Sequence, residues 1–478
     1  MKKSIICICA FLIVSSCSND FIDLIPKESV TVDVIYKTDK DFSDALTGVY
    51  RSIRDQYGKF YVFGDIRADD SEMEFKKSNV ESYADAFTLN SNDNLVRDAW
   101  QRYYQAIFRA NTLLSKIEEI DATKIPNKNR YIGEARFLRA IAYFDLVRIF
   151  GAVPAITKPV SVPESYQIPR EPVDNIYNTI IIPDFQAAEG FLPTSYTGSN
   201  IGRATQGAAK SMLGRVYLTI KDYQKAESKL MEVTSMGYAL VANYNALFDY
   251  TNKRHSEYIY NIEYEQGING GSSFTNWFAP NSEAFGRHFG IVGSRDEFNN
   301  PSFELMALFE DHDTRKEITV GIYGGFYNND SVFIALPGST NQKYTKKYLI
   351  SEPAQYDSRA DWKVIRYGDV LLMLAEAMNE NGKTAEAIPY LNMIRKRARV
   401  DEYPTTMSKA ETFAAIEKER RLELSFEGVR WFDLVRWGKA YEVMKSQGMA
   451  EFMTLFPIPL AQVQLINDPA ILSQNPGY

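Results

Sequence analysis

The chain has 478 residues, of which 45% are hydrophobic and 24% charged, and its formal net charge is −7. These values are typical of globular proteins and exclude a disordered chain, a collagen-like chain and a polytopic membrane protein. The acidic balance argues against nucleic-acid binding, which needs a basic surface. With only three Cys and three His, we expect neither a structural zinc site nor a disulfide framework. The length predicts either two or three domains or one large repeat assembly.

The first sixteen residues have the features of a secretion signal. Lys2 and Lys3 precede an unbroken apolar run from Ile5 to Val14. As a helix this run extends about 15 Å, half the thickness of a bilayer core, so it is a signal-peptide core and not a transmembrane helix. Small residues then lead to Cys17 in a sequence that resembles a bacterial lipobox. We expect cleavage after residue 16 and lipidation of Cys17. The alternative is an ordinary secretion signal with a chance cysteine.

Cleavage at this point would change the composition of the mature chain. Cys17 would be its only cysteine, and the loss of Lys2 and Lys3 would make the net charge more negative. An exported protein without disulfides depends on its core and helix packing for stability. A cysteine that carries several acyl chains is a permanent membrane tether, because two or more chains anchor stably.

Apolar residues recur at helical spacing through both ends of the chain. Thr38 and Asp41 could form a capping box before the first of these stretches. The prolines of 151–200 predict an irregular segment around one helix, and those of the tail, 451–478, predict extended chain. The predicted helices are 41–54, 95–120, 131–150, 173–182, 205–220, 223–235, 369–381, 385–400, 407–424 and 428–446.

Two of the predicted helix pairs resemble one repeat. The pair at 205–235 and the pair at 369–400 share a small residue in the first helix, then Ala and Leu in the second, at a shift of 161 residues. This arrangement is typical of tetratricopeptide units, in which small residues let two helices approach closely. The pentapeptide FDLVR also occurs twice, at Phe144–Arg148 and at Phe432–Arg436. The alternative is that Ala and Leu recur by chance in any helix pair.

The middle of the chain, about 240–350, has a different character. Aromatic residues are denser there than elsewhere, glycines interrupt it, and long helical periodicity is absent. Alternating runs at Tyr258–Ile262 and Val332–Ile334 predict minor strands. We therefore expect a loop-rich subdomain on a helical scaffold, and binding sites are often found on such loops.

The sequence contains no GxSxG, HExxH, P-loop or GxGxxG motif, so the motifs predict no catalytic residues, metal or cofactor. Asp311-His312-Asp313 is more typical of a solvated helix end than of a metal site. Asp69, Asp70 and Glu72 form the acidic cluster that best suits paired carboxylates. The paired carboxylates of a glycoside hydrolase stay an open alternative, because the sequence does not give their separation. Whether a calcium ion binds also stays open, since no segment fits the twelve-residue calcium loop.

Carbohydrate binding needs a flat aromatic ring for the apolar face of a sugar and fixed polar groups for its hydroxyls. Residues 274–281 offer both beside several glycines. The alternative is that Trp277 and Phe278 anchor the loop to the scaffold. The candidate ligand-binding residues are Phe274, Asn276, Trp277, Phe278 and Asn281, followed by Arg67, Asp69, Tyr323 and Tyr327.

Longer motifs in a fixed order resemble the SusD/RagB family of outer-membrane nutrient-uptake lipoproteins. They cover nearly the whole chain, and the middle matches least. The motifs are FIDLIPKESVT at Phe21–Thr31, W-x3-Y-x2-I-x3-N at Trp100–Asn111, GEARFLRAIAYFDLVRIFGAVP at Gly133–Pro154, ATQGAAKSMLGRVYL at Ala204–Leu218, PSFELMALFEDHDTR at Pro301–Arg315, IRYGDVLLMLAEAMNENG at Ile365–Gly382, ERRLELSFEGVRWFDLVRWG at Glu419–Gly438 and the terminal Leu455–Tyr478.

The resemblance implies a mainly α fold, with four tetratricopeptide-like helix pairs and a loop-rich, aromatic-rich subdomain containing minor β structure. It implies one domain over 17–478, with the scaffold mainly in 38–240 and 360–450 and the ligand-binding subdomain at about 240–350. It also implies a lipid-anchored, non-catalytic cell-surface protein that passes an oligosaccharide or polysaccharide to a SusC-like TonB-dependent transporter. The tetratricopeptide helices would face the transporter. A surface glycoside hydrolase, a pure protein-interaction scaffold and a peptide-binding protein are the alternatives.

Overall fold

The computed structural model describes residues 36–73, 79–267, 270–336 and 342–478. The signal segment and the lipidation site at Cys17 lie outside these ranges. Within them, every helix is too short or too polar to span a bilayer.

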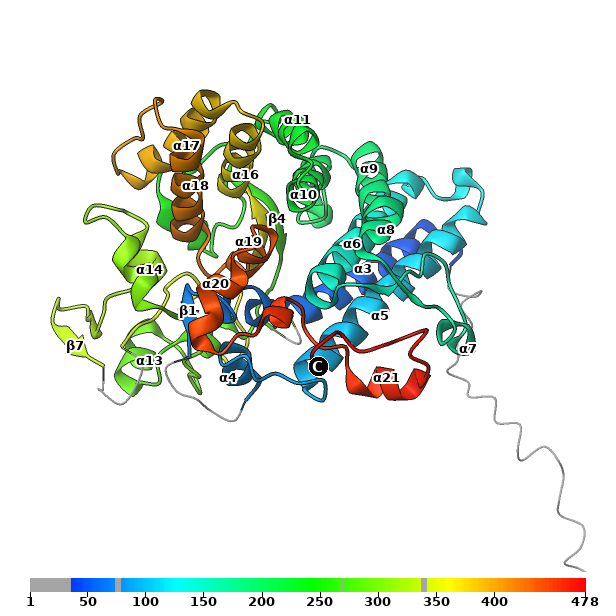
Figure 1. Cartoon of the computed structure of the whole chain (residues 1–478), viewed down its shortest axis with the longest axis horizontal. Coiled ribbons are helices and arrows are strands. Elements are labelled where there is room, and N and C mark those ends of the chain that lie inside the picture. The colour runs from blue at the N-terminus through cyan, green and yellow to red at the C-terminus, as the bar shows by residue number, and fades with distance from the viewer. Residues whose placement is uncertain (1–35, 74–78, 268–269, 337–341) are drawn as a thin grey trace, which may run out of the picture.

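The scaffold is a curved row of helices (Figure 1). Each helix packs against the next in the order α3, α5, α6, α9, α10, α11, α16, α17 and α18. The helix predictions for these segments are confirmed, except for α9, which follows the helix predicted over 173–182. Their bounds are α3 Asp39–Tyr57, α5 Asn94–Glu118, α6 Lys128–Phe150, α9 Ile182–Phe191, α10 Gln206–Thr219, α11 Tyr223–Thr234, α16 Tyr367–Glu380, α17 Thr384–Ala398 and α18 Lys409–Leu424.

Helix ends follow local sequence signals in several places. The capping box of Thr38 and Asp41 is present at the start of α3. The helix predicted over 173–182 is longer than expected: α8 (Val173–Ile176) continues through a π-helical turn, η4 (Tyr177–Ile181), into α9. The single helix predicted over 428–446 is wrong. It splits into α19 (Arg430–Arg436) and α20 (Ala440–Met444) because Gly438 adopts a φ of +72°, a left-handed conformation that interrupts a right-handed helix.

The C-terminal tail is less extended than predicted. It forms a 3₁₀ turn, η8 (Glu451–Thr454), and one helix, α21 (Leu460–Ile466). Pro459 stands directly before α21, where its fixed φ suits the start of a helix. Asn475 secures the tail by donating hydrogen bonds to the carbonyls of Phe150 and Phe456 at 3.0 and 2.7 Å.

The two repeated helix pairs are neighbours in space. α11 packs directly on α16, so the segment between them is an insertion between adjacent units of one row. Gly214 of α10 faces Leu230 of α11, and a Cβ at Gly214 would lie 2.5 Å from Leu230 Cδ2. The matching Ala375 and Leu391 of the second pair are likewise fully buried. The small residue therefore permits the close helix approach that the repeat pattern predicts.

The inserted segment carries short elements. The predicted strand at 258–262 is confirmed as β4 (Tyr258–Ile262), and the second is shifted by one residue to β7 (Phe333–Ala335). Sequence reasoning missed β8 (Trp362–Arg366), which pairs antiparallel with β4 and continues directly into α16. The remaining elements are β1 Ser71–Glu72, β5 Asn300–Pro301, β6 Gly325–Tyr327, α4 Val80–Asp85, α12 Phe274–Phe278, α13 Glu283–Phe289, α14 Phe303–Leu308 and α15 Lys316–Val320.

The remaining short elements lie between these segments, and η7 directly follows α20. They are η2 Val62–Ile66, η3 Ala122–Lys124, β2 Val153–Pro154, α7 Val162–Ser165, β3 Arg170–Glu171, η5 Gly198–Asn200, η6 Tyr244–Phe248 and η7 Lys445–Gln447. β2 pairs with β3, and β1 pairs with β5, both antiparallel.

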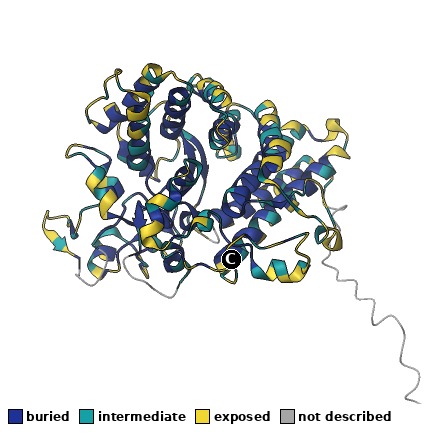
Figure 2. Ribbon diagram, in the orientation of Figure 1, coloured by how far each residue is buried: buried dark blue, intermediate teal, exposed yellow. Residues whose placement is uncertain are grey.

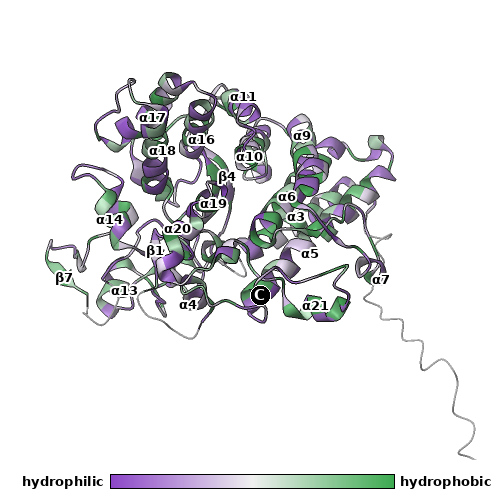
Figure 3. Cartoon of the chain, viewed as in Figure 1, coloured by the Kyte–Doolittle hydropathy of each residue, from purple (hydrophilic) through white to green (hydrophobic). Residues whose placement is uncertain are grey.

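Buried residues lie on the facing sides of the helices and beneath the inserted segment, while exposed residues occupy the outer turns and loop tips (Figure 2). Hydropathy follows the same division (Figure 3). One large apolar core runs through the scaffold into the inserted segment, and a second, smaller core lies among α13, β6 and β7.

Charged side chains also lie in the interior, beside α18 and the turn that follows it. Arg366 of β8 donates to Glu427 at 2.8 Å and to Glu257 at 2.8 Å, and Lys347 donates to Glu427 at 2.9 Å. All of these groups are buried. The further members of this buried charge network are Arg315, Arg395, Arg397, Glu419 and Glu423.

We predict opposite effects for two Gly→Ala substitutions. Gly214→Ala should destabilise the fold by about 1–3 kcal/mol, because the added methyl overpacks against the buried Leu230. Gly48→Ala is the matched control, since it lies within α3 with nothing within 4 Å of its Cβ position. It should stabilise by roughly 0.5–1 kcal/mol through helix propensity. Chemical denaturation measures both, and equal signs would contradict the packing described.

We also predict acid sensitivity from Glu427. Burial alone would raise the pKa of Glu427, but Arg366 and Lys347 lower it from 4.5 to about 2. A lowered folded-state pKa contributes stability above pH 4.5, and this contribution, about 3 kcal/mol, is lost as the pH falls from 4.5 to 2. Glu427→Gln should therefore flatten the pH dependence of unfolding in that window, while lowering stability at neutral pH because it weakens the pairing of two buried cations. The exposed Glu118→Gln should change neither.

Candidate functional site

Two of the residues predicted to bind ligand are structural. Arg67 is 1% exposed, and its guanidinium lies between the rings of Phe87, Trp431 and Phe456, 4.8, 5.0 and 4.1 Å from their centroids. Asp69 is buried and accepts hydrogen bonds from Arg430 at 2.8 and 2.9 Å. The expectation that these two side chains contact a ligand is corrected, because both are enclosed by protein.

The carboxylates of Asp69 and Asp70 form ion pairs with arginines. Arg421 pairs with both Asp69 and Asp70, at 2.9 and 2.7 Å. Burial opposes ionisation of Asp69, but Arg430 and Arg421 keep its pKa below the ordinary value, whereas burial raises the pKa of Asp70. Although such a divergence is also seen between catalytic acids and bases, both carboxylates are buried beneath their arginines. We assign this cluster to fold stabilisation.

Three residues of the predicted aromatic loop point inward. Phe274, Asn276 and Phe278, which belong to α12, are fully buried. Phe274 packs on Trp362 and Tyr348 with ring centroids 5.3 Å apart in each pair, and Phe278 packs on Tyr348 at 5.2 Å. The expectation that these three side chains meet a ligand is corrected. The alternative, that aromatic residues anchor this loop to the scaffold, holds for the two phenylalanines.

The buried side chain of Asn276 fixes the outer loops by hydrogen bonds to their backbone. Its Nδ2 donates to the carbonyls of Val292 and Ser294 at 2.9 and 2.7 Å, and its Oδ1 accepts from the backbone N–H of Tyr356 at 2.7 Å. The backbone carbonyl of Asn276 accepts from the N–H of Asp296 at 2.9 Å. One buried amide therefore fixes two separate surface loops relative to each other.

Trp277 is half-buried at the edge of this region. The Nζ of Lys59 lies 3.9 Å from the centroid of its ring and donates to Glu81 at 2.7 Å. Tyr61 packs on the same indole at 5.6 Å and also donates to Glu81, at 2.9 Å. A cation over an aromatic face is a favourable contact, so this arrangement fixes the orientation of the indole.

A broad hollow of about 650 Å³ lies over α13 and the loop that follows it. Asn281 lies on its wall with an exposed side chain. The other lining residues are Glu283, Gly286, Arg287, Gly290, Ile291, Val292, Gly293, Ser294 and Arg295. The wall thus combines glycines with amide, hydroxyl and guanidinium groups.

Tyr356 stands beside this hollow with 37% of its surface exposed. Its hydroxyl lies 2.6 Å from Ser294 Oγ and 3.0 Å from Asp296 Oδ2, while Gln355 donates to Ser294 Oγ at 2.6 Å. Tyr356 has a φ of +58°, which is uncommon for a non-glycine residue. Sequence reasoning missed this tyrosine, because its position depends on a buried asparagine eighty residues away in the chain.

The two remaining candidates, Tyr323 and Tyr327, lie elsewhere in the inserted segment. They are 51% and 55% exposed; Tyr323 lies in the turn two residues before β6, and Tyr327 is the last residue of β6. The structure therefore does not bring them together with Trp277 and Asn281 in one hollow.

The sequence Asp311-His312-Asp313 lies beside another surface hollow. Asp313 is engaged by Arg315, whose Nη2 and Nε donate to its carboxylate at 2.6 and 2.9 Å. Among the described residues, no three His, Cys, Asp or Glu side chains converge in a way that would hold a metal ion.

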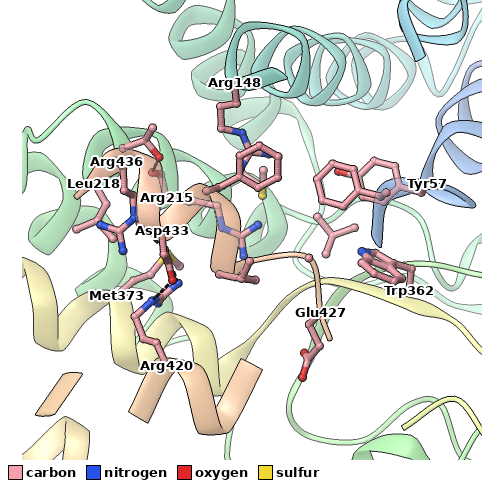
Figure 4. Close-up of a pocket in the computed structure, with 17 residues that line it drawn as sticks. Tyr57, Arg148, Arg215, Leu218, Trp362, Met373, Arg420, Glu427, Asp433 and Arg436 are labelled. Carbon is pink, nitrogen blue, oxygen red and sulfur yellow. Dashed lines mark hydrogen bonds and ion pairs between the residues drawn. The ribbon is translucent and has the colours of Figure 1, made fainter. Parts of the chain in front are cut away.

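A separate cavity lies inside the scaffold, where α6 and α10 meet α16, α18 and α19 (Figure 4). Arg148, Arg215, Trp362 and Tyr57 line it, and its volume is about 30 Å³. That space holds one or two water molecules, so it is too small for a sugar or a peptide.

Comparison with known proteins places the chain among helical surface proteins. The model of the SusD family matches residues 239–454, and the model described as "Starch-binding associating with outer membrane" matches residues 20–218. SusD-like protein P25 of Formosa agariphila is 26% identical, with the whole of both chains covered. A SusD-like protein of Bacteroides ovatus is 25% identical over 89% of this chain and 80% of its own.

Solved structures agree with these matches. A laminarin-binding SusD-like protein superposes with a TM-score of 0.79 and 29% identity, covering 93% of this chain and 100% of its own. Surface glycan-binding protein A from Bacteroides fluxus has a TM-score of 0.78 over 92% of this chain and 100% of its own. At 22% identity, that second likeness concerns the fold.

We predict that Asn276→Ala loosens the loops around the hollow. Three hydrogen-bonding groups would lose their buried partner, so the protein should lose about 1–3 kcal/mol of stability. Amide hydrogen exchange should accelerate in peptides covering 290–296 and 353–358. Asn281→Ala is the matched control, since its side chain is exposed, and it should change stability by less than about 0.5 kcal/mol. Unchanged exchange in Asn276→Ala would contradict its positioning role.

Proposed function

Because the chain belongs to the SusD/RagB family, we propose that it captures an oligosaccharide or polysaccharide at the cell surface without cleaving it. It then delivers this glycan to a SusC-like TonB-dependent transporter in the outer membrane. Lipidated Cys17 anchors the protein, and the tetratricopeptide helices face the transporter.

The observation that carries the binding role is the loop surface around the hollow. An exposed ring, Tyr356, stands beside fixed hydroxyl, amide and carboxylate groups of Ser294, Gln355 and Asp296. A pyranose presents an apolar C–H face and several hydroxyls, so it needs a ring and polar partners at fixed positions. We assign the ring to Tyr356, with Trp277 at the edge and Asn281 on the wall.

The chemistry of the acidic groups favours binding over hydrolysis. A glycoside hydrolase needs two carboxylates placed on either side of the scissile bond. Here Glu283 pairs with Arg295, and Asp296 accepts the hydroxyl of Tyr356. These pairings occupy the carboxylates that border the hollow and orient the surrounding loops.

The names of relatives suggest where to begin. One similar structure is of a laminarin-binding protein, and one family model carries a starch-binding description. A panel for calorimetry and affinity electrophoresis therefore starts with laminarin and starch and extends to other plant, host and microbial glycans. We expect saturable binding to one glycan class and no release of reducing ends. Release of reducing ends would favour the hydrolase. Absence of binding to every glycan of the panel would favour a peptide ligand or a pure scaffold.

We predict that Trp277→Ala and Tyr356→Ala each weaken glycan binding by about 1–2 kcal/mol, roughly 5- to 30-fold. Tyr356→Phe should lose less, because it keeps the ring and removes only the hydroxyl. Phe108→Ala is the matched control: Phe108 is 52% exposed, but it lies on α5 of the scaffold. Equal affinities of the wild type and both alanine variants would contradict the assigned surface.

Delivery is a separate step with its own measurement. The full-length protein, extracted from its native outer membrane, should co-purify with a TonB-dependent transporter, and Cys17→Ser should release the protein from the membrane fraction. Retention of the Cys17→Ser variant on the membrane would contradict the lipid anchor.

A further inference from the structure

Four exposed aromatic side chains gather at the far end of the inserted segment. They are Phe303, Tyr323, Tyr327 and Phe333, with 57, 51, 55 and 44% of their surface exposed. We call them the hairpin face, because three of them belong to the β6–β7 hairpin or directly precede it. Contiguous exposed apolar surface of this kind is uncommon on a soluble body and marks interaction sites.

The alternation of side chains between the two sides of the β6–β7 hairpin produces this face. Phe326 pairs with Ile334 across the two strands and points inward, where it meets Phe285 at 5.4 Å. Side chains alternate between the two sides of a strand, so Tyr327 and its cross-strand partner Phe333 point outward, 5.5 Å apart.

A glycine lets the rings lie close to the backbone. A Cβ at Gly325 would lie 2.5 Å from Phe333 Cζ, so the Phe333 ring lies across that glycine. Tyr323 precedes β6 in a turn in which Gly324 has a φ of +83°. Tyr323 in turn packs edge-to-face on Phe303, 5.6 Å away. The four rings thus form two edge-to-face pairs at this end of the inserted segment.

The hairpin is attached to the hollow through α13, on which its buried side packs. Phe326 contacts His288 and Phe289, at 4.8 and 5.8 Å, near the end of α13. The next residues, from Gly290 to Arg295, form the wall of the hollow. The hairpin and the hollow are therefore built on the same short helix.

A second connection limits the distance from Trp277. The N–H of Phe298 donates to the carbonyl of Trp277 at 2.7 Å. Phe303 follows five residues later, and five residues of chain span at most about 18 Å. Phe303 thus lies at most about 18 Å from the residue that is hydrogen-bonded to Trp277, so a polymer of several sugar units can span the two rings.

We propose that the hairpin face is a second contact surface for the same glycan, and that the ligand is a polysaccharide long enough to reach both surfaces. This inference rests on the proposed glycan-binding function. The face presents aromatic rings, the group that stacks on sugar C–H faces. The ion pair of the buried Lys343 with the partly exposed Glu72 borders it, with the Lys343 ammonium 4.0 Å from the Phe303 ring. Its attachment to the same short helix as the hollow, and its bounded distance from Trp277, favour a long glycan over an unrelated protein partner.

Two surfaces on one polymer predict a dependence on chain length. Once the hollow holds one part of a glycan, the hairpin face meets another part at a high effective concentration, so affinity rises without any new kind of contact. A short oligosaccharide reaches one surface only and gains nothing.

The test uses matched ladders, from short oligosaccharide to parent polysaccharide, of laminarin, starch, xylan, mannan and pectin, with the full-length protein. Wild type should bind the polymer at least tenfold more tightly, per chain, than the short oligosaccharide. Tyr327→Ala/Phe333→Ala should abolish that gain and leave short-oligosaccharide affinity within about twofold. Trp277→Ala should weaken both. Phe108→Ala/Phe191→Ala, which removes two exposed rings from the scaffold, is the matched control and should behave as wild type.

Three results would overturn the proposal. Unchanged polymer affinity in Tyr327→Ala/Phe333→Ala is the first, and the independent Tyr323→Ala variant covers the case in which the double variant fails to fold. The second is that Tyr327→Ala/Phe333→Ala keeps its polymer affinity and no longer co-purifies with the transporter, which would assign the face to a protein partner. The third is that wild type binds no member of any ladder. This result would contradict the proposed function itself and is thereby distinct from the other two.

Discussion

The buried glutamates of α18 and of the turn directly after it are the constraint on which the rest of the structure depends. Glu419, Glu423 and Glu427 recur every four residues and lie in the interior. Buried carboxylates are costly unless each is paired and hydrogen-bonded. Their partners come from four places far apart in the sequence: the segment before α15, the turn at 347, β8 and α17. The partners are Arg315, Lys347, Arg366, Arg395 and Arg397. Because all of these pairs must form together, they fix how the inserted segment sits on the helical row.

A second consequence concerns the site itself. The side chains that hold the loops, above all Asn276, are buried, while those proposed to meet a ligand, such as Tyr356 and Asn281, are exposed. The positioning of the loops and the chemistry of their surface are therefore carried by different residues. In such a surface the exposed residues can be substituted, so that a different glycan is bound, without disturbing the buried hydrogen bonds that hold the loops.

The repeated pentapeptide shows how the two halves of the scaffold meet. In each copy the aspartate pairs with the arginine three residues later, Asp145 with Arg148 and Asp433 with Arg436. The guanidinium of Arg148 also lies over Phe144 of its own copy and Phe432 of the other, 3.9 and 4.1 Å from the ring centroids. The two copies thus contact each other beside the small internal cavity, and this contact joins α6 to α19.

The sequence by itself determined the helical row, the helix pairs, the strand at 258–262 and the family, because these depend on local periodicity, on caps and on motifs many residues long. Only the tertiary structure decided the site. Phe274, Asn276 and Phe278 share a segment with Trp277 and have the same composition as a sugar platform, yet three of the four are buried. A five-residue helix such as α12 carries too little periodicity to show which side faces inward. Likewise Tyr356 reaches the surface through a hydrogen bond to Asn276, and Arg67 is enclosed by rings from three distant segments. Such contacts join residues far apart in the chain, so no local pattern records them.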